Sequence, residues 1–459
     1  LVRHYLAAPV IVTFVSAIIG NILGYTVFKE LIVYMYYSNY SLPTYVTLWN
    51  PDAFIKTTII PVVLMFVINL LVLIRMLRHT PLQFLRCDLK KNKRKKAMRL
   101  PRWNFLSRFR LRIIFQNIPN YLILFVGIAF ISIMLAMAIG MPSTLQYYKD
   151  NTKDMMFADY QYVLKSYKDE TGKEITTKNS DAEKFSMDSL LYKTDALDEE
   201  VSIYGVEDTS KYISLPDAKN LKEKEVYISK PFSDKYDVAV GDTVTLNAKY
   251  EKKKYLFKVK GFFEHSQSIA VFMPIEQYRT VFDKDEDAFD GFFTNTKIKD
   301  VKKDYIATVI TEREITKMSN QLDHTMGSYM LYFQFLCVVL SAVLIYLLTK
   351  IIIEKNEVAI SMTKILGYTD GEIAKLYLLA TTIVVIICAA LSVLVGTLVM
   401  RSVWTVMLQS MSGWFTFIMG PLDYFKMFAF IFVGYLVVML FDFRRIRKIP
   451  LDEALKRVE

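Results

Sequence analysis

The chain has 459 residues, of which 53% are hydrophobic, 14% aromatic and 22% charged, and its formal net charge is +11. With a mean hydropathy of +0.26, it is too apolar for an ordinary soluble protein and too charged for one embedded wholly in lipid. Membrane spans joined to a soluble domain are therefore expected. A disulfide framework is excluded, because Cys87 lies beside a basic loop while Cys337 and Cys388 lie inside apolar runs.

Long apolar runs predict the membrane spans. A helix needs about 20 mostly apolar residues to cross roughly 30 Å of hydrocarbon. Runs of this kind lie at about 6–28, 57–77, 120–141, 328–353, 375–400 and 426–443. Few charges interrupt them, and Asp442 is expected near the end of the last span, within reach of water. The sequence therefore predicts a polytopic α-helical membrane protein.

Basic residues predict the orientation. Almost every charge between Arg75 and Arg112 is positive, with Asp88 as the acidic exception, and the tail after residue 443 is also basic. Because positive loops stay in the cytoplasm, 87–119 is predicted as a basic cytoplasmic linker and entry helix, with the C-terminus inside. Residues 29–56, 142–327 and 401–425 then lie outside, and residues 354–374 lie inside. A nucleic-acid patch is the alternative for the linker, but contact with anionic lipid headgroups is favoured between two spans.

Residues 142–327 carry charges of both signs, turn residues and short alternating segments, which predict an extracellular α+β domain. The predicted strands are Asp159–Lys165, Glu225–Ser229, Asp242–Lys249, Lys254–Val259 and Ile269–Phe272. Helices are predicted at Ile275–Phe282 and near Asp181–Lys193. Two features that suggest chemistry are interpreted as ordinary surface: His265 beside Glu264, and the acidic turn Asp283–Asp287, which lacks the glycine and glutamate of a calcium loop.

Both ends of this domain are expected to extend membrane helices. Ile315, Met318, Leu322, Met326 and Tyr329 recur at intervals of three or four residues, and Leu145 and Tyr148 follow the preceding span. This spacing predicts one apolar stripe and hence a paired helical stalk between the domain and the membrane. A single solvent-side helix is the alternative.

The stretch that joins the fourth and fifth predicted spans has an unusual pattern. Residues 354–379 read EKNEVAISMTKILGYTDGEIAKLYLL. The pattern predicts a charged start, a short helix, a turn at Gly367 and Tyr368, a break at Asp370 and Gly371, and a new helix. We call residues 354–379 the elbow. It is amphipathic, lies at the predicted cytoplasmic face, and suits the docking of a soluble partner.

The elbow resembles the segment of FtsX/MacB-type ABC permeases that contacts the ATPase. Residues 357–360 (EVAI) and 365–368 (ILGY) occupy the places of the family's Arg-Glu-Ile-Ala and Leu-Gly-Ala motifs. The ending at 450–455 (PLDEAL) resembles the family's Pro-Leu-x-x-Ala-Leu exit. GDTVTL, YLFKVKGFFE and IAVFMPIEQY follow one another as in MacB-type external domains. The charged residues of 354–356 depart from the family's arginine-rich start.

An internal repeat is also expected. Residues 2–24 align with 374–396 without a gap, and the exit at 75–82 aligns with 444–451. Residues 1–86 are accordingly predicted as the C-terminal part of a first FtsX-like unit, and 328–459 as a second unit. Because the chain starts at Leu1 without methionine, we expect it to be an N-terminally truncated piece of a longer polypeptide.

The resemblance implies a permease subunit that moves its extracellular domain when a partner ATPase dimer closes on ATP. The residues implied at the ATPase contact are Glu354, Glu357, Gly367, Tyr368, Asp370 and Glu372. The chain has no phosphate loop, so no enzyme activity of its own is expected, and no cofactor, metal or nucleic acid is predicted. A proton-driven transporter is disfavoured by the scarcity of charge within the spans.

Family members export or extract peptides, antibiotics or lipoproteins, or confer resistance to antimicrobial peptides. Membrane lipids and an extracellular peptide, lipoprotein or protein ligand are the other expected partners. The lysine-, tyrosine- and asparagine-rich composition suits a Gram-positive plasma membrane. The alternative is a membrane-anchored sensor or regulator that binds an extracellular ligand or activates cell-wall hydrolases, without an ATPase.

Overall fold

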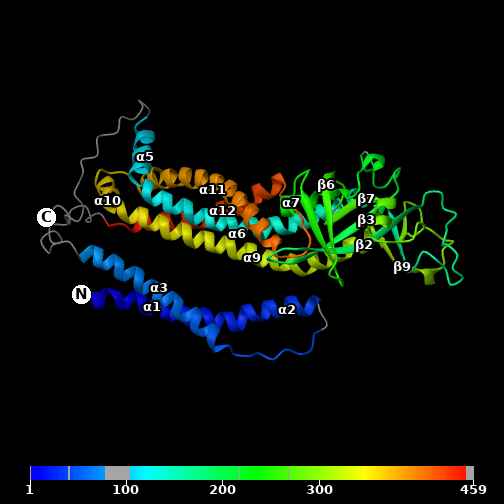
Figure 1. Ribbon diagram of the computed structural model, residues 1–459. Helices are drawn as coiled ribbons and strands as arrows, with labels where there is room; N and C mark the ends of the chain where they lie inside the picture. Colours follow the sequence, from blue (N-terminus) through cyan, green and yellow to red (C-terminus); the bar gives the residue numbers. More distant parts are fainter. Residues whose placement is uncertain (1, 40–41, 78–103, 217, 267, 451–459) are drawn as a thin grey trace. The chain divides into compact units, whose positions relative to one another are not determined.

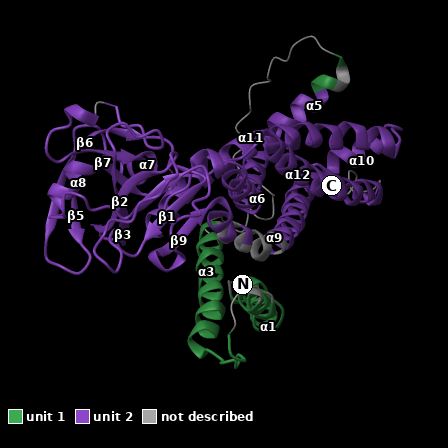
Figure 2. Ribbon diagram, turned by 90° about the vertical axis from the view of Figure 1, so that its right-hand side faces the viewer, with its two compact units in different colours: residues 1–108 green, residues 109–459 purple. Residues whose placement is uncertain are grey.

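The computed structural model describes residues 2–39, 42–77, 104–216, 218–266 and 268–450. They form two compact units, residues 1–108 and 109–459, shown in different colours in Figure 2. Across the described residues, six helices are long and apolar enough to cross a membrane. Each of the six apolar runs in the sequence overlaps one of them. The chain is thus a multi-pass membrane protein that carries a sheet-rich domain.

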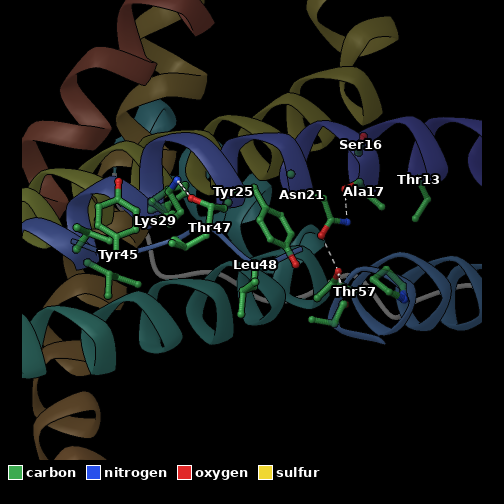
Figure 3. Close-up of a pocket in the computed structure, with 18 residues that line it drawn as sticks. Thr13, Ser16, Ala17, Asn21, Tyr25, Lys29, Tyr45, Thr47, Leu48 and Thr57 are labelled. Carbon is green, nitrogen blue, oxygen red and sulfur yellow. Dashed lines mark hydrogen bonds between the residues drawn. The ribbon is translucent and has the colours of Figure 1, made fainter. Parts of the chain in front are cut away.

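The first unit is a pair of packed helices. Its elements are α1 (Val2–Leu23), the π-helical turn η1 (Gly24–Phe28), α2 (Lys29–Asn39) and α3 (Pro51–Leu77). Asn21 of α1 joins the two long helices, because its amide donates to Thr58 Oγ1 (3.0 Å) and accepts from Thr57 Oγ1 (2.7 Å). Figure 3 shows Asn21 and Thr57 beside a mainly apolar groove of about 920 Å³ that follows α1.

The second unit contains a helix bundle. Its helices are α5 (Phe105–Gln116), α6 (Ile118–Asp150), α9 (Glu312–Lys355), α10 (Glu357–Ile365), α11 (Asp370–Gln409) and α12 (Pro421–Lys448). Their shared core is apolar and includes Leu124, Leu135, Ile345 and Trp404. Figure 1 shows α6, α9, α11 and α12 side by side, with the sheet at one end and α10 at the other. The bundle therefore connects the sheet domain to α10.

The described residues of the sheet domain, which covers 151–311, form nine strands. They are β1 (Tyr160–Leu164), β2 (Glu183–Lys193), β3 (Asp198–Val206), β4 (Glu225–Ser229), β5 (Thr243–Ala248), β6 (Lys254–Phe263), β7 (Ala270–Pro274), β8 (Gly291–Thr294) and β9 (Ile306–Thr311). The short helices are α7 (Lys230–Tyr236) and α8 (Ile275–Val281), with 3-10 turns η2 (Lys153–Met155), η3 (Ala218–Asn220) and η4 (Lys303–Tyr305).

The strand order is β3-β7-β4-β6-β5-β2-β8-β1-β9, and β3 also pairs with β2. The extra pairing closes six strands on themselves, and β8, β1 and β9 extend from β2. Side chains such as Val201, Ile228, Leu246, Phe257 and Val271 fill one core of the closed part. The domain thus has an interior of its own at the end of the helix bundle.

All five strands expected from the sequence are present, as is the helix expected at 275–282. The helix expected near Asp181–Lys193 is wrong, because those residues form β2 instead. β2 pairs with β3 along nine consecutive positions and also meets β5 and β8. Tertiary pairing therefore outweighs the local helical pattern of this segment.

Asp442 is buried, with 1% of its surface exposed, so the expectation that it lies within reach of water is wrong. Neither of its carboxylate oxygens has a hydrogen-bond partner among the described residues. Neighbouring helices cover it, although α12 ends only six residues later.

Both ends of the sheet domain continue into bundle helices. α6 runs on to Asp150, and α9 begins at Glu312, directly after β9. The stripe expected on α9 falls largely outside the described side chains, because those of Met318, Leu322 and Met326 are not placed. Cys87, most of the basic linker and the exits at 78–82 and 451–455 also lie outside the described residues.

Candidate functional site

The elbow is a short helix between two sharp changes of direction. α9 ends at Lys355, α10 follows from Glu357 to Ile365, and α11 begins at Asp370. Gly367 has a φ of +88°, a left-handed conformation that favours glycine. Asp370 and Gly371 were expected to break the chain, but they form the first turn of α11. The turn expected at Gly367 and Tyr368 covers residues 366–369, and it ends there because Thr369 caps α11.

A reciprocal cap fixes the start of α11. The Thr369 hydroxyl accepts from Glu372 N, while the Glu372 carboxylate accepts from Thr369 N at 2.9 Å. This capping box satisfies main-chain donors that the first helical turn leaves unpaired. The Thr-x-x-Glu spacing could have been recognised in the sequence. Glu372 therefore shapes the elbow from within.

An apolar cluster holds the elbow against the bundle. Ile360 of α10 is fully buried and belongs to a cluster with Ile113 of α5, Ile353 of α9, Ile373 of α11 and Ile446 of α12. The five residues come from five helices. A displacement of α10 must therefore shift its neighbours or open a cavity among them.

Polar contacts tie the elbow to the end of α12. Glu354 Oε1 lies 3.1 Å from Arg445 Nη2. Lys364 lies 3.1 Å from Asp370 and also donates to the main-chain oxygens of Arg447 and Ile449. The lysine thus binds carbonyls at the C-terminal end of a helix, where cations are favoured.

The six residues implied at the ATPase contact differ in what they do. Asp370 and Glu372 have partners within the elbow, and Glu354 has one on α12. Glu357 lines a polar cavity of about 780 Å³ together with Arg444, Arg445 and Lys448. Gly367 and Tyr368 lie exposed in the turn. The structure thus brings these residues into one region, and their role stays a prediction.

Exposed apolar side chains surround the turn, and of these the sequence reasoning named only Tyr368. Leu366 is 72% exposed, and Met362, Ile365 and Tyr368 are also exposed. We call these four residues the apolar tip. A contiguous apolar patch rimmed by charge is typical of a protein-protein contact. The signal was available, because MTKILGY places apolar residues on a side that Ile360 does not use.

A second junction joins the sheet domain to loop 410–420, between α11 and α12. Lys235 of α7 and Glu199 of β3 form a buried ion pair. Lys235 Nζ also donates to Met411 O (2.7 Å) and Gly413 O (3.1 Å), and Gly413 N donates to the second oxygen of Glu199 (2.9 Å). We call this the outer junction. The side chains of Lys235 and Glu199 thus bind main-chain atoms of loop 410–420.

Neighbouring groups complete the outer junction. Tyr236 donates to Glu199, and burial together with this carboxylate raises the pKa of the tyrosine well above its usual range. On the bundle side, Thr416 N donates to Tyr148 Oη, and Thr144 exchanges two hydrogen bonds with Ile418. Trp414 packs against the cores of both the bundle and the sheet domain. The loop is therefore bound from both sides.

The sequence shows no signal for the outer junction, because its residues are far apart in the chain and of common types. Among the described residues, no group of three or more His, Cys, Asp or Glu could hold a metal ion. What the geometry offers is two mechanical contacts at opposite ends of one helix bundle.

A comparison with models of known protein families finds a match to part of the chain. Residues 331–451, which include most of α9, the elbow, α11 and α12, match the family model of the FtsX-like permease C-terminal domain. The match shows that this segment is similar to the C-terminal domain of FtsX-like permeases, a family of membrane components of ABC transporters. The resemblance to FtsX-like permeases is confirmed over these residues, and the second, N-terminal copy stays a prediction.

A solved structure is also similar to part of the chain. It is the extracellular domain of the noncanonical ABC-type transporter YknZ from Gram-positive bacteria, with 10% identity and a TM-score of 0.21. The similarity covers 37% of this chain and 94% of that one. No curated protein matches the sequence.

Proposed function

We propose that the protein is the permease subunit of an FtsX/MacB-type ABC system, in which a cytoplasmic ATPase dimer docks on the elbow and moves the sheet domain. The observation that carries the proposal is α9. It is one helix of 44 residues that begins at the last strand of the sheet domain and ends at the elbow. A helix rises 1.5 Å per residue, so α9 is about 66 Å long and can carry a displacement across a bilayer.

The apolar tip is the proposed ATPase contact, with Glu354 and Glu357 at its side. Gly367 permits the turn that exposes Leu366 and Tyr368. Asp370 and Glu372 keep the turn in shape through Lys364 and Thr369. An ATPase that closes on ATP would push on α10, and the cluster around Ile360 would pass the motion to α9, α11 and α12.

The sheet domain is the proposed output. Its two connections to the bundle are the helices α6 and α9, and the outer junction adds a third. With the elbow in the cytoplasm, the sheet domain faces the outside of a plasma membrane, and the composition suits a Gram-positive cell. Export or extraction of a peptide, antibiotic or lipoprotein, or resistance to antimicrobial peptides, would follow from movement of this domain.

The test is a pull-down of the full chain from its native membrane, with ATPase activity measured in the eluate. Leu366→Glu adds a charge to the apolar tip without disturbing a buried contact. Gly367→Pro distorts the turn itself, because proline requires a negative φ. Leu256→Glu is the matched control, since Leu256 is also exposed but lies on β6 of the sheet domain.

We expect wild type and Leu256→Glu to retain the ATPase, and both elbow variants to lose at least about nine-tenths of it, since one charge at the centre of a small contact removes roughly 1.4 kcal/mol or more. If all four proteins elute without ATPase, the permease proposal is wrong and the sensor or regulator alternative replaces it. If all four retain it, the ATPase docks elsewhere.

A further inference from the structure

The sheet domain contains a small, partly open cavity beside the start of α9. A cavity of about 300 Å³ is lined by Phe157, Gln161, Tyr204, Ile310 and Ile315, among others. Its size is at the low end of the range for ligand sites, which is about 300 to 1,000 Å³, so it suits one bulky side chain better than a whole cofactor. Ile315 belongs to the first turn of α9, so an occupant would touch the helix that leads to the elbow.

The cavity has both apolar and polar walls. Gln161 is 7% exposed, its Nε2 lies 3.9 Å from the sulfur of Met187, and its side chain also hydrogen-bonds with Tyr204. The other polar residues of the lining are Thr152, Ser266 and Ser268. An occupant would therefore meet apolar side chains together with several polar groups.

The strand next to the cavity has an open edge. Among the described strands, β9 pairs only with β1. On β1, Leu164 N donates to Asp290 O on the β8 side, so residues 162 and 160 also direct their main-chain groups there. Gln161 and Val163 then face β9, where they are opposite Ile310 and Thr308.

This alternation leaves Val309 with main-chain groups directed away from β1. A further strand could pair with them, as in the addition of a peptide to a sheet edge. The residue of that strand opposite Ile310 would project from the same face of the sheet, beside Ile310 and into the cavity. The free edge and the cavity therefore fit one and the same ligand.

We propose that β9 binds an extended polypeptide segment as an additional strand, with a bulky apolar side chain inserted between Gln161, Tyr204 and Ile315. The proposal names a ligand class for the sheet domain, and it rests on the proposed function only in placing that domain outside the cell. Binding would engage β9 and the first turn of α9 together, and so report the ligand to the helix bundle.

The test uses the full chain in lipid nanodiscs with ¹³C-methyl methionine. The probes are two acetylated seven-residue peptides of alternating threonine and valine, with either phenylalanine or lysine at the centre. Val309→Pro removes the outward N–H of β9, while Val309→Ala is the matched control that keeps the N–H and loses the same side chain.

We expect the phenylalanine peptide to shift the methyl signals of Met155 and Met156, which line the cavity, and the lysine peptide to leave them unchanged. Val309→Pro should weaken binding at least tenfold relative to Val309→Ala. Equal binding to the two variants, equal shifts from the two peptides, or no shift at all would overturn the proposal. Because this experiment measures peptide binding directly, its outcome is independent of the ATPase pull-down. Peptide binding can be absent when the ATPase co-elutes, and it can be present when the ATPase does not.

Discussion

The elbow and the outer junction lie at opposite ends of the same helices, but different forces hold them. Around Ile360 the contacts between helices are apolar, and the ion pairs of Glu354 and Asp370 are partly exposed. At the outer junction, Lys235 and Glu199 are almost completely buried and bind main-chain atoms of loop 410–420. Apolar contact is non-directional, whereas a buried ion pair with main-chain partners requires one geometry.

The difference assigns the two ends different mechanical properties. The elbow can adjust when a partner binds, because non-directional apolar contacts allow its helices to shift together at modest cost. The outer junction cannot slide without leaving a buried charge unpaired, so loop 410–420 and the sheet domain should move as one body. We expect motion to enter at an adaptable joint and to leave through a rigid one.

The largest effect is expected from Lys235→Met, which breaks the rigid joint. The substitution leaves the carboxylate of Glu199 buried without its cation, which costs about 3–5 kcal/mol. Thermal unfolding of the full chain should show a sheet domain that unfolds earlier. Hydrogen exchange should also show that loop 410–420 loses protection.

Two further variants isolate the cause of that effect. Lys230→Met removes a lysine from the same helix whose ion pair with Asp234 is largely exposed, so it should change stability by no more than about 1 kcal/mol. The double variant Lys235→Met with Glu199→Leu removes both charges and should recover much of the loss. If the double variant is as unstable as the single one, packing rather than charge holds the junction.

A smaller effect is expected from Gly396→Ala, which changes the coupling between the two ends. A Cβ at Gly396 would lie 2.8 Å from Ser132 C and 3.0 Å from Ile133 N, so α6 and α11 would have to separate. Overpacking of this kind costs about 1–3 kcal/mol. In a membrane preparation with the ATPase bound, we expect ATP-dependent changes in hydrogen exchange at the sheet domain to weaken.

Gly371→Ala is the matched control, because nothing lies within 4 Å of a Cβ at this first-turn position of α11. It should be neutral, or stabilising by up to about 1 kcal/mol through helix propensity. Equal loss of stability in the two variants would mean that the close approach of α6 to Gly396 is unimportant.

The sequence reasoning succeeded where the signal is local and failed where it is not. Apolar runs locate the helices because lipid demands long apolar segments, and alternation locates β5 and β6 because exposed and buried side chains alternate along each. β2 was mistaken for a helix because its identity depends on pairing with β3. At the candidate site, the motif around Gly367 and the Thr369 cap are local, whereas Lys235 meets Gly413 only after folding.

The smallest effect is expected from a substitution of Asp181, whose contacts lie within the sheet domain. Asp181 also gives the sharpest contrast with the buried ion pair of the outer junction. Asp181 accepts from Lys211 (2.8 Å) and from Asn295 N (2.7 Å), and these two contacts hold the pKa of its carboxyl well below its usual range. A lowered pKa in the folded state stabilises the domain above the unfolded value of about 3.9, and the stabilisation disappears as the pH falls through the folded pKa.

Asp181→Asn should therefore lower the unfolding temperature of the sheet domain at about pH 7, and the difference from wild type should shrink as the pH is lowered below about 4. Asp195→Asn, in an exposed turn of the same domain, is the control and should show no such trend. Protection of loop 410–420 should be unchanged in both variants, because Asp181 does not contact the outer junction. Loss of that protection in Asp181→Asn would show that the whole sheet domain, rather than the Lys235–Glu199 pair, determines how the loop is held.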